Sequence, residues 1–393
     1  MLKMLRNKNY KTRIFFLFFL LMLFFNPLSG NEKLSHDATI SLLTCGPGSQ
    51  LYAAFGHSAL WVNDPAMEID AVYNFGTFDF NTPYFYLKFL RGKLDYALSV
   101  SDSANFMEEY REENRWVYRQ ELSISHEQLQ SFYDSLEVLR KPANRFYRYD
   151  FFRNNCSNRL TDLIVFFAAD SSRLDSLQRS TGKTYRQALR PYIGGREWLS
   201  LGINLLLGPF SDQKMTARQS TFLPDKLMDE MQKTGLAKSR KLLNAETFGL
   251  PAVKEVSLAM ILIWLLVFAL VIEALWLRTS PEFSKRIDMV LFAFSGLLGL
   301  LFAFLWVGSD HVSMHVNLNL IWANPFNLLA ALAIYKNQNK VLKVYLVLYS
   351  LSLFFLLINW GRLPQKLPLE IMPLAVALAF RSLDRVFGFG KKR

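Results

Sequence analysis

The stretch DFFRNNCSNRL, residues 150–160, places a cysteine where a polar segment gives way to an apolar periodicity. The residues that follow, LTDLIVFF, have helical spacing, so the pattern predicts a helix that starts close to Cys156. The first turn of a helix has free backbone N–H groups, and its positive end lowers the pKa of a thiol. Cys156 is therefore a candidate nucleophile. The alternatives are a buried apolar filler and half of a disulfide with Cys45, the other of the two cysteines.

Residues 38–100 are rich in β-branched and aromatic residues, and we expect them to be mainly strands. The runs SALWV and AVYNFG flank the turn-like NDPAME, which predicts a hairpin. Helical patterns follow at 125–140, with Ser125 as the expected N-cap, and at 156–177, as one helix or a pair. This order predicts an α+β domain.

The segment AAFGHSALWV supplies a histidine at the start of the first strand of this hairpin. Gly56, directly before His57, would allow another backbone or a substrate to approach closely. A histidine that acts as a base needs a polar partner on its second ring nitrogen, and Asp70 and Asn74 lie on the next expected strand. We expect a thiol dyad of Cys156 and His57, oriented by Asp70 or Asn74. The alternative for a lone histidine is a structural role.

Hydrophobic residues make up 51% of the 393, and they concentrate in a short N-terminal block and in the last 140 positions. This distribution indicates a membrane protein with a soluble part between the two blocks. Residues 1–30 have a basic head, an apolar run and the end NPLSG, which is typical of a signal peptide or a signal anchor. Residues 31–250 are therefore expected to be an exported domain, and residues 251–393 a transmembrane domain.

Five apolar segments are expected to span the membrane, although the third is polar and the fifth is short. They lie at about 256–277, 288–307, 317–335, 341–360 and 368–380. With five spans, the connections on the cytoplasmic side hold eleven Lys and Arg, and those outside hold two. The positive-inside rule then places the C-terminus in the cytoplasm, so we expect a multi-pass protein of the inner membrane.

The net charge of +12 does not indicate nucleic-acid binding. The basic residues gather at the ends of apolar segments, and the soluble part has no basic patch with interleaved aromatic residues. We expect no nucleic-acid partner, and no cofactor.

The external connection GSDHVSMHVNLNLIWANP is unusually polar for its place between two spans. Polar residues at membrane depth are costly and often functional, so His311, His315, Asn317 and Asn319 are expected to line a groove for a lipid headgroup or a lipoprotein. The alternatives are exposure in a wet loop, or a metal pair of His311 and His315 at helical spacing, for which only Asp310 offers a third ligand.

Two residues beside the cysteine are further candidates for substrate binding. Asn155 directly precedes the thiol, and Arg159 lies one helical turn after it. A guanidinium there could face a lipid phosphate, although a plain surface charge is an equal alternative.

A histidine that precedes the cysteine by 99 residues resembles the circularly permuted papain-like fold of NlpC-type and lecithin retinol acyltransferase-like proteins. Over residues 38–380 the chain further resembles the Lnb family of bacterial lipoprotein N-acyltransferases. The motifs that carry this resemblance are AAFGHSALWV, DAVYNFGTFDF, FYLKFLRGKLDY, YRYDFFRNNCSNRL and FLPDKL. The resemblance implies a permuted papain-like periplasmic domain followed by an all-α bundle of five transmembrane helices.

By the same resemblance, Cys156 is the acyl-accepting nucleophile and His57 is its base. The expected reaction moves an acyl chain from a phospholipid to the α-amine of a lipoprotein. The phospholipid donor, the lipoprotein acceptor and the membrane are the expected partners. Two other hypotheses remain: an envelope thiol peptidase, amidase or phospholipase, and a non-enzymatic scaffold with a Cys45–Cys156 disulfide.

Overall fold

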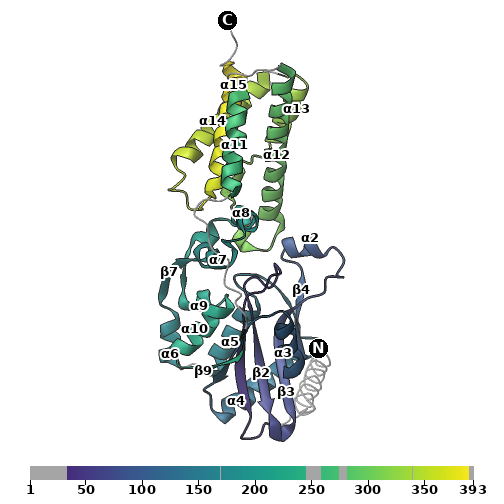
Figure 1. Cartoon of the computed structure of the whole chain (residues 1–393), viewed down its shortest axis with the longest axis vertical. Coiled ribbons are helices and arrows are strands. Elements are labelled where there is room, and N and C mark those ends of the chain that lie inside the picture. Colours follow the sequence, from purple (N-terminus) through teal and green to yellow (C-terminus); the bar gives the residue numbers. More distant parts are fainter. Residues whose placement is uncertain (1–32, 169, 245–257, 274–280, 339, 389–393) are drawn as a thin grey trace, which may run out of the picture.

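The computed structural model describes residues 33–168, 170–244, 258–273, 281–338 and 340–388. The predicted signal segment, residues 1–30, lies outside the described residues. The chain is elongated, with a mixed half built around a β-sheet and an all-helical half stacked along the same axis (Figure 1). The predicted succession of a mixed α+β domain and a helical region is therefore confirmed.

A seven-stranded antiparallel sheet organises the N-terminal half, in the order β6-β4-β3-β2-β1-β5-β9. Its strands are β1 (Thr39–Cys45), β2 (His57–Asp64), β3 (Ile69–Thr77), β4 (Asp95–Ser101), β5 (Val117–Leu122), β6 (Phe146–Arg148) and β9 (Ala237–Leu243). A smaller sheet pairs β7 (Ser180–Thr184) with β8 (Lys214–Thr216). The predicted hairpin is the β2–β3 pair, and His57 opens its first strand as expected.

The helices of this half are α2 (Phe85–Leu90), α3 (Ser103–Glu112), α4 (His126–Arg140), α5 (Cys156–Ala168), α6 (Ser171–Leu177), α7 (Tyr185–Ile193), α8 (Glu197–Leu206), α9 (Ala217–Ser220) and α10 (Pro224–Lys233). Ser125 caps α4 through a capping box with Gln128, as predicted. The segment 156–177 forms the predicted helix pair, α5 and α6.

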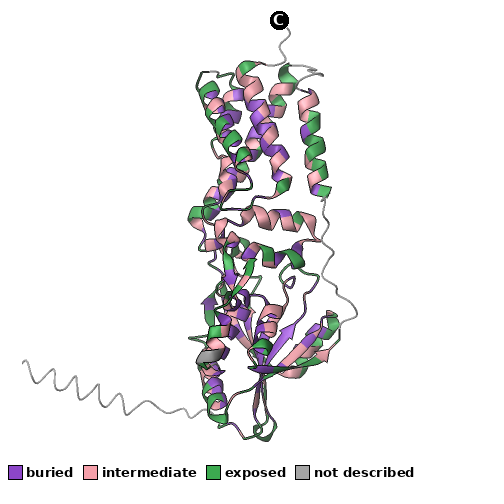
Figure 2. Ribbon diagram, turned by 90° about the vertical axis from the view of Figure 1, so that its left-hand side faces the viewer, coloured by how far each residue is buried: buried purple, intermediate pink, exposed green. Residues whose placement is uncertain are grey.

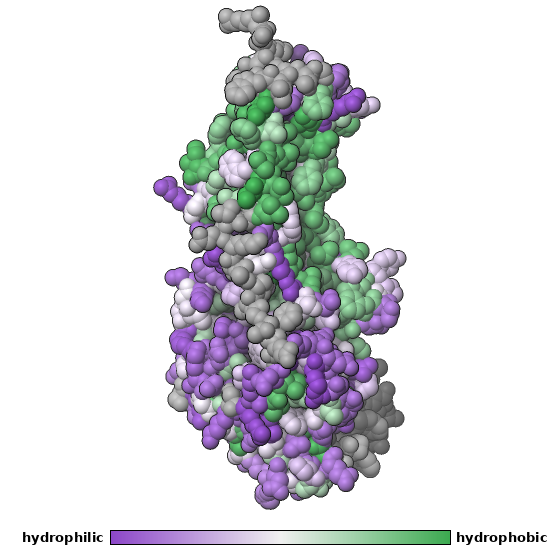
Figure 3. Space-filling view, in the orientation of Figure 1, coloured by the Kyte–Doolittle hydropathy of each residue, from purple (hydrophilic) through white to green (hydrophobic). Residues whose placement is uncertain are grey.

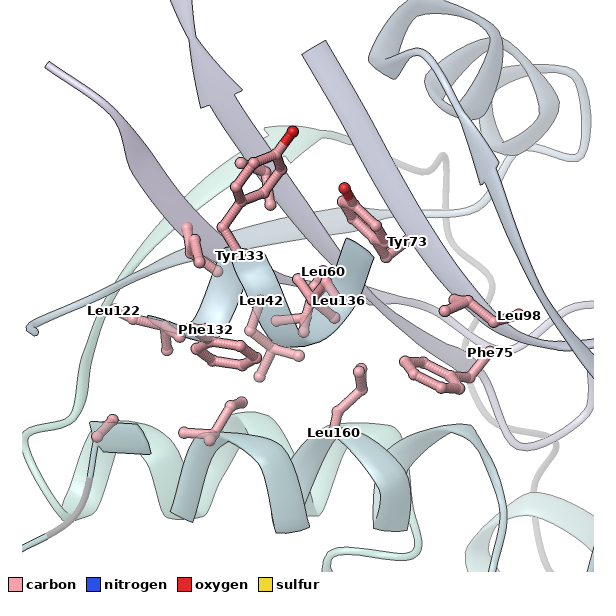
Figure 4. Packing of buried hydrophobic residues seen from close by; sticks show 14 of the residues in the cluster. Leu42, Leu60, Tyr73, Phe75, Leu98, Leu122, Phe132, Tyr133, Leu136 and Leu160 are labelled. Atoms are coloured by element: carbon pink, nitrogen blue, oxygen red, sulfur yellow. The ribbon is translucent and has the colours of Figure 1, made fainter. Parts of the chain in front are cut away.

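One face of the sheet packs against α4 and α5. Alternate residues of the central strands point to this face and meet Phe132 and Leu136 of α4 and Leu160 of α5, all fully buried (Figure 4). The apolar stripe of α5 therefore fixes this helix across β2 and β3. As a result, the first residue of α5 lies next to the first residue of β2.

The prediction of strand structure through 38–100 is wrong for residues 78–94. These residues leave the sheet after β3 and return at β4, with α2 between them. Most of their aromatic side chains are exposed, so the strand-like composition of this segment does not reflect burial in a sheet.

The C-terminal half contains α11 (Leu258–Ile272), α12 (Pro281–Gly308), α13 (Asn327–Tyr335), α14 (Lys340–Ile358) and α15 (Met372–Phe387). Among the described helices, α12 and α14 are long and apolar enough to cross a bilayer alone, with mean hydropathies of 2.4 and 2.3. α12 packs mainly against α13 and α14 mainly against α15, with buried residues inside the bundle and many exposed residues on its outside (Figure 2). That outside is predominantly hydrophobic, as expected for a surface in contact with lipid (Figure 3).

Two of the five expected spans have different bounds in the structure. The segment 317–335 is α-helical only over Asn327–Tyr335, because its polar part folds into the short 3-10 helix Leu318–Ile321. The segment 368–380 begins later and extends further, since α15 continues to Phe387. Arg381, which the sequence suggested to be a cytoplasmic loop cation, is a buried residue of α15.

A buried ion network joins three parts of the helical half. The Arg381 guanidinium donates to Asp288 of α12 at 2.5 Å and to Glu273, directly after α11, at 2.7 Å. Arg385 also pairs with Asp288. Because buried charges without partners are very costly, each member constrains the position of the others.

We predict that Arg381→Met destabilises the full-length protein by about 3 kcal/mol, because Glu273 would be left buried without its ionic partner. Thermal unfolding in detergent measures the loss. The double variant Arg381→Met/Glu273→Gln should recover part of it. Equal stability of Arg381→Met and the unsubstituted protein would contradict a structural role for the network.

Candidate active site

Two anchors hold the start of α5. The Asn155 side chain accepts a hydrogen bond from the Asn158 N–H at 2.9 Å, as an N-cap does, and its amide donates to the carbonyls of Phe151 and Phe222 at 2.9 and 2.8 Å. Asn155 is buried, and both ends of its amide are engaged within the protein. Asn155 therefore positions the turn that carries Cys156, and its expected contact with substrate stays a prediction.

A second contact joins the strand and the helix one residue beyond the candidate dyad. The hydroxyls of Ser58 and Ser157 lie 3.1 Å apart, and both side chains are fully buried. Because Ser58 follows His57 and Ser157 follows Cys156, this pair fixes the relative position of the thiol and the imidazole.

The imidazole of His57 contacts Asn74 on the neighbouring strand. Nε2 of His57 lies 2.6 Å from Oδ1 of Asn74, so the amide oxygen accepts the Nε2–H and leaves Nδ1 for the thiol. Asp70 does not contact this histidine. Its carboxylate accepts from the Trp61 indole at 2.7 Å and the Ser103 hydroxyl at 2.8 Å. Of the two orienting candidates, the structure brings Asn74 to His57 and places Asp70 at the other end of β3.

The thiol and the imidazole alter each other's protonation. Burial favours the neutral thiol, but the charge and hydrogen bond of His57 and the N–H of Ser58 outweigh it and lower the pKa of Cys156. Burial would likewise lower the pKa of His57, but the Cys156 charge and its hydrogen bond, with that of Asn74, raise it. The two shifts stabilise a thiolate–imidazolium pair, which is the nucleophilic form of such a dyad.

Sequence reasoning missed two residues beside the dyad, Gly76 and Tyr147. Gly76 has φ +103°, and a Cβ there would lie 3.8 Å from Cys156 Cβ, 3.8 Å from His57 Cε1 and 4.0 Å from the Tyr147 hydroxyl. The space that a side chain would fill is thus open between these three groups. Gly76 follows Asn74 by two positions, so the two-residue period of a strand could have placed both on one face.

The Tyr147 hydroxyl is a buried polar group without a hydrogen-bond partner in the described part of the chain. Burial and the nearby Cys156 charge raise the pKa of Tyr147, so its O–H stays protonated and can donate. The Arg159 guanidinium lies 4.2 Å above the ring of Tyr147, and its Nε donates to Asn154 at 3.0 Å. Arg159 is therefore near the site, stacked on the ring whose hydroxyl borders the thiol.

Two family models match the chain. The model of the Lnb N-terminal periplasmic domain matches residues 32–190, and that of the Lnb transmembrane domain matches residues 254–393. The chain belongs to the Lnb family. As an Lnb protein, it is a membrane protein with a periplasmic domain. No curated protein and no solved structure matches it significantly.

In this Lnb protein, the predicted polar groove is a joint between the two halves. Asn317 and Asn319 donate to the carbonyl of Leu205 at 2.7 and 2.9 Å, which satisfies an acceptor at the end of α8. The ring of His315 lies 2.9 Å from the carbonyl of Ser309. All three side chains contact the protein's own backbone, and their expected role in lining a substrate groove stays a prediction.

His311 takes part in the same joint from the other side. Its ring lies 3.0 Å from the Phe89 carbonyl and 3.3 Å from the carboxylate of Asp150. Asp150 in turn accepts from the N–H groups of Phe152 and Arg153, in the turn before Cys156. His311 is therefore linked to the turn before Cys156 through Asp150, and its expected contact with substrate stays a prediction. His311 and His315 bind different partners, and the described residues contain no cluster of three potential metal ligands.

Cys45 differs from Cys156 in its surroundings. Both thiols are free in the structure, which leaves the disulfide hypothesis without support. Burial raises the pKa of Cys45 to about 12, so this thiol stays neutral and unreactive.

We predict that iodoacetamide modifies Cys156 below the pH at which an ordinary thiol reacts, because the rate follows the thiolate and the pKa is lowered. His57→Ala should shift this reaction to higher pH, since it removes the largest interaction that lowers the pKa. Peptide mass spectrometry resolves both cysteines, and unmodified Cys45 reports that the protein stays folded. Identical pH profiles for the variant and the unsubstituted protein would contradict the dyad.

Proposed function

We propose that this Lnb protein is a lipoprotein N-acyltransferase. It takes an acyl chain from a phospholipid, carries it as a thioester on Cys156, and transfers it to the α-amine of the diacylglyceryl-cysteine at a lipoprotein N-terminus. The observation that carries the proposal is the Cys156–His57–Asn74 arrangement in a periplasmic domain that is hydrogen-bonded to a membrane domain. Both the donor and the acceptor of this reaction are held in the membrane.

In the first step, the Cys156 thiolate attacks the ester carbonyl of the phospholipid. The C–S bond forms and the C–O bond breaks. The His57 imidazolium gives its proton to the departing alkoxide of the lysophospholipid. Asn74 keeps the ring in the orientation that presents Nδ1 to the thiol and the leaving group.

In the second step, the neutral amine of the lipoprotein attacks the thioester carbonyl. His57, now neutral, takes a proton from the amine, the C–N bond forms, and the C–S bond breaks. The thiolate and the imidazolium are regenerated. A solvent-poor site favours this aminolysis over hydrolysis, because water would otherwise compete for the thioester.

The Tyr147 hydroxyl is suited to the carbonyl oxygen in both steps. It borders the open space at Gly76, as the dyad does, and among the described residues it has no hydrogen-bond partner. A protonated donor at this place stabilises the negative charge that develops on the oxygen as the carbonyl becomes tetrahedral.

The proposal also covers the fold of the periplasmic domain and the topology of the membrane domain. The periplasmic domain would be a permuted papain-like fold, supported by a strand histidine that precedes a helix-start cysteine and contacts an asparagine. The membrane domain would cross the inner membrane five times with its C-terminus in the cytoplasm, as the distribution of Lys and Arg favours.

We predict that Cys156→Ala abolishes N-acylation of a lipoprotein, measured by mass spectrometry of its N-terminal peptide. Asn74→Ala should lower the rate by at least about tenfold, since the ring loses its orienting acceptor. Asp70→Ala is the matched control on the same strand and should retain activity. An acyl thioester on Cys156, released by hydroxylamine, identifies the intermediate; full activity of Cys156→Ala would refute the proposal.

We further predict that Tyr147→Phe slows acylation of Cys156 by about 10- to 100-fold, because the developing oxyanion loses a donor. The pH dependence of Cys156 alkylation should stay unchanged, since the ring and its contact with Arg159 remain. Tyr96→Phe removes a hydroxyl from a neighbouring ring, 6.4 Å away between centroids, and serves as the control. Equal rates for the two variants would exclude Tyr147 as the donor.

A further inference from the structure

The segment between β3 and β4, residues 78–92, projects from the periplasmic domain and is termed here the α2 projection. It carries an unusual number of large exposed side chains. Those of the tip are Phe80, Tyr84, Tyr86, Leu87 and Phe89, with 40–79% of each exposed. Such a concentration of exposed aromatic residues on one segment marks an interaction site.

The base of the projection is fixed to the end of a membrane-spanning helix. The Arg91 guanidinium donates to the carbonyl of Gly308, the last residue of α12, at 3.1 Å. The Ser309 hydroxyl donates to the Leu90 carbonyl at 2.7 Å, and the Asp310 N–H donates to the Arg91 carbonyl at 2.9 Å. These bonds hold the projection beside the end of α12 that faces the periplasmic domain (Figure 1).

The exposed side chains continue the apolar surface of the membrane domain. In Figure 3 the hydrophobic belt of the helices reaches down to the α2 projection, which lies beside the end of α12. The rest of the periplasmic domain in this view is mainly hydrophilic. Phe, Leu and Tyr side chains are suited to the bilayer interface, because a tyrosine places its ring among acyl chains and its hydroxyl near the headgroups.

A series of ring contacts joins the projection to the candidate active site. Phe80 and Phe85 both pack on Phe78, with centroids 4.9 and 5.7 Å away. Phe78 contacts Tyr96 at 5.2 Å, and Tyr96 lies 6.4 Å from Tyr147, the residue that borders the thiol. A row of packed aromatic rings thus runs from the exposed tip to the neighbourhood of Cys156.

We propose that the α2 projection inserts its aromatic tip into the periplasmic leaflet of the membrane, where it contacts phospholipid and admits the acyl donor toward Cys156. The membrane contact stands on the geometry of the projection, and the role in donor entry rests on the proposed function. The occupant is phospholipid rather than a soluble protein, because the tip adjoins the lipid-facing surface of α12 and is held there by its end.

The depth of the tip in the bilayer tests the membrane contact. A nitrobenzoxadiazole label on Tyr86→Cys, in full-length Cys156→Ala protein, is placed in nanodiscs that contain doxyl-labelled phosphatidylcholine. We expect strong quenching and a blue-shifted emission. The matched control is a label on Val138→Cys, an exposed position of α4 at the far end of the domain, which should show neither (Figure 1). Quenching at position 86 no greater than at 138 would overturn the proposal.

Donor entry is tested with Tyr84→Ser/Tyr86→Ser, which alters two exposed side chains that the fold does not bury. In proteoliposomes this variant should form the Cys156 acyl thioester at least about tenfold more slowly, since two aromatic contacts with lipid are lost. Alkylation of Cys156 by water-soluble iodoacetamide should be unchanged. An unaltered acylation rate would refute the entry role. If the unsubstituted protein forms no thioester, the proposed function fails, while the depth measurement still decides the membrane contact.

Discussion

The packing of the first turn of α5 against the first residue of β2 is the constraint on which the site depends. The apolar stripe of α5 places this helix on the sheet, and the buried Ser58–Ser157 contact fixes its register along the strand. The Asn155 cap then sets the direction in which the chain enters the helix. These three features bring into contact a thiol and an imidazole that lie 99 residues apart in sequence.

The second constraint is the joint between the two halves. Carbonyls at the end of α8 and around α2 would be unsatisfied without donors, and the polar connection after α12 supplies these donors from Asn317, Asn319 and Ser309. The result is a periplasmic domain held in a defined orientation on the membrane helices. This orientation matters for the proposed acyl transfer, in which the thiol must face a substrate held in the bilayer.

The sequence could predict the elements with strong local signals. The hairpin at residues 57–77, the Ser125 capping box and the helix that starts at Cys156 depend on patterns of a few neighbouring residues, and these predictions are confirmed. The prediction of the Cys156–His57 dyad follows from two of these features, the strand that starts at His57 and the helix that starts at Cys156. The choice between Asp70 and Asn74 depends on the register of the hairpin, which pairs Asp70 with Asn63 near the turn and leaves Asn74 toward the end where His57 lies.

Other features depended on distant parts of the chain. The polar side chains of residues 309–319 resemble a binding groove in sequence, because nothing local reveals that carbonyls more than a hundred positions earlier accept their hydrogen bonds. The aromatic residues of 78–92 favour a strand by composition, and only their exposure distinguishes an interface from a sheet. Tyr147 had no local signal, since an orphaned hydroxyl is visible only once its surroundings are known.

Hydrogen bonds join His311 to Asp150 and Asn317 to Leu205. Each half of the protein therefore contributes residues to the boundary between them. A chimaera that exchanges residues 31–250 between relatives would therefore separate donors from their acceptors. Transplantation would have to carry the connection at 308–319 together with the periplasmic domain. By its contacts, the loop is part of the periplasmic domain, although in sequence it lies between two segments of the membrane domain.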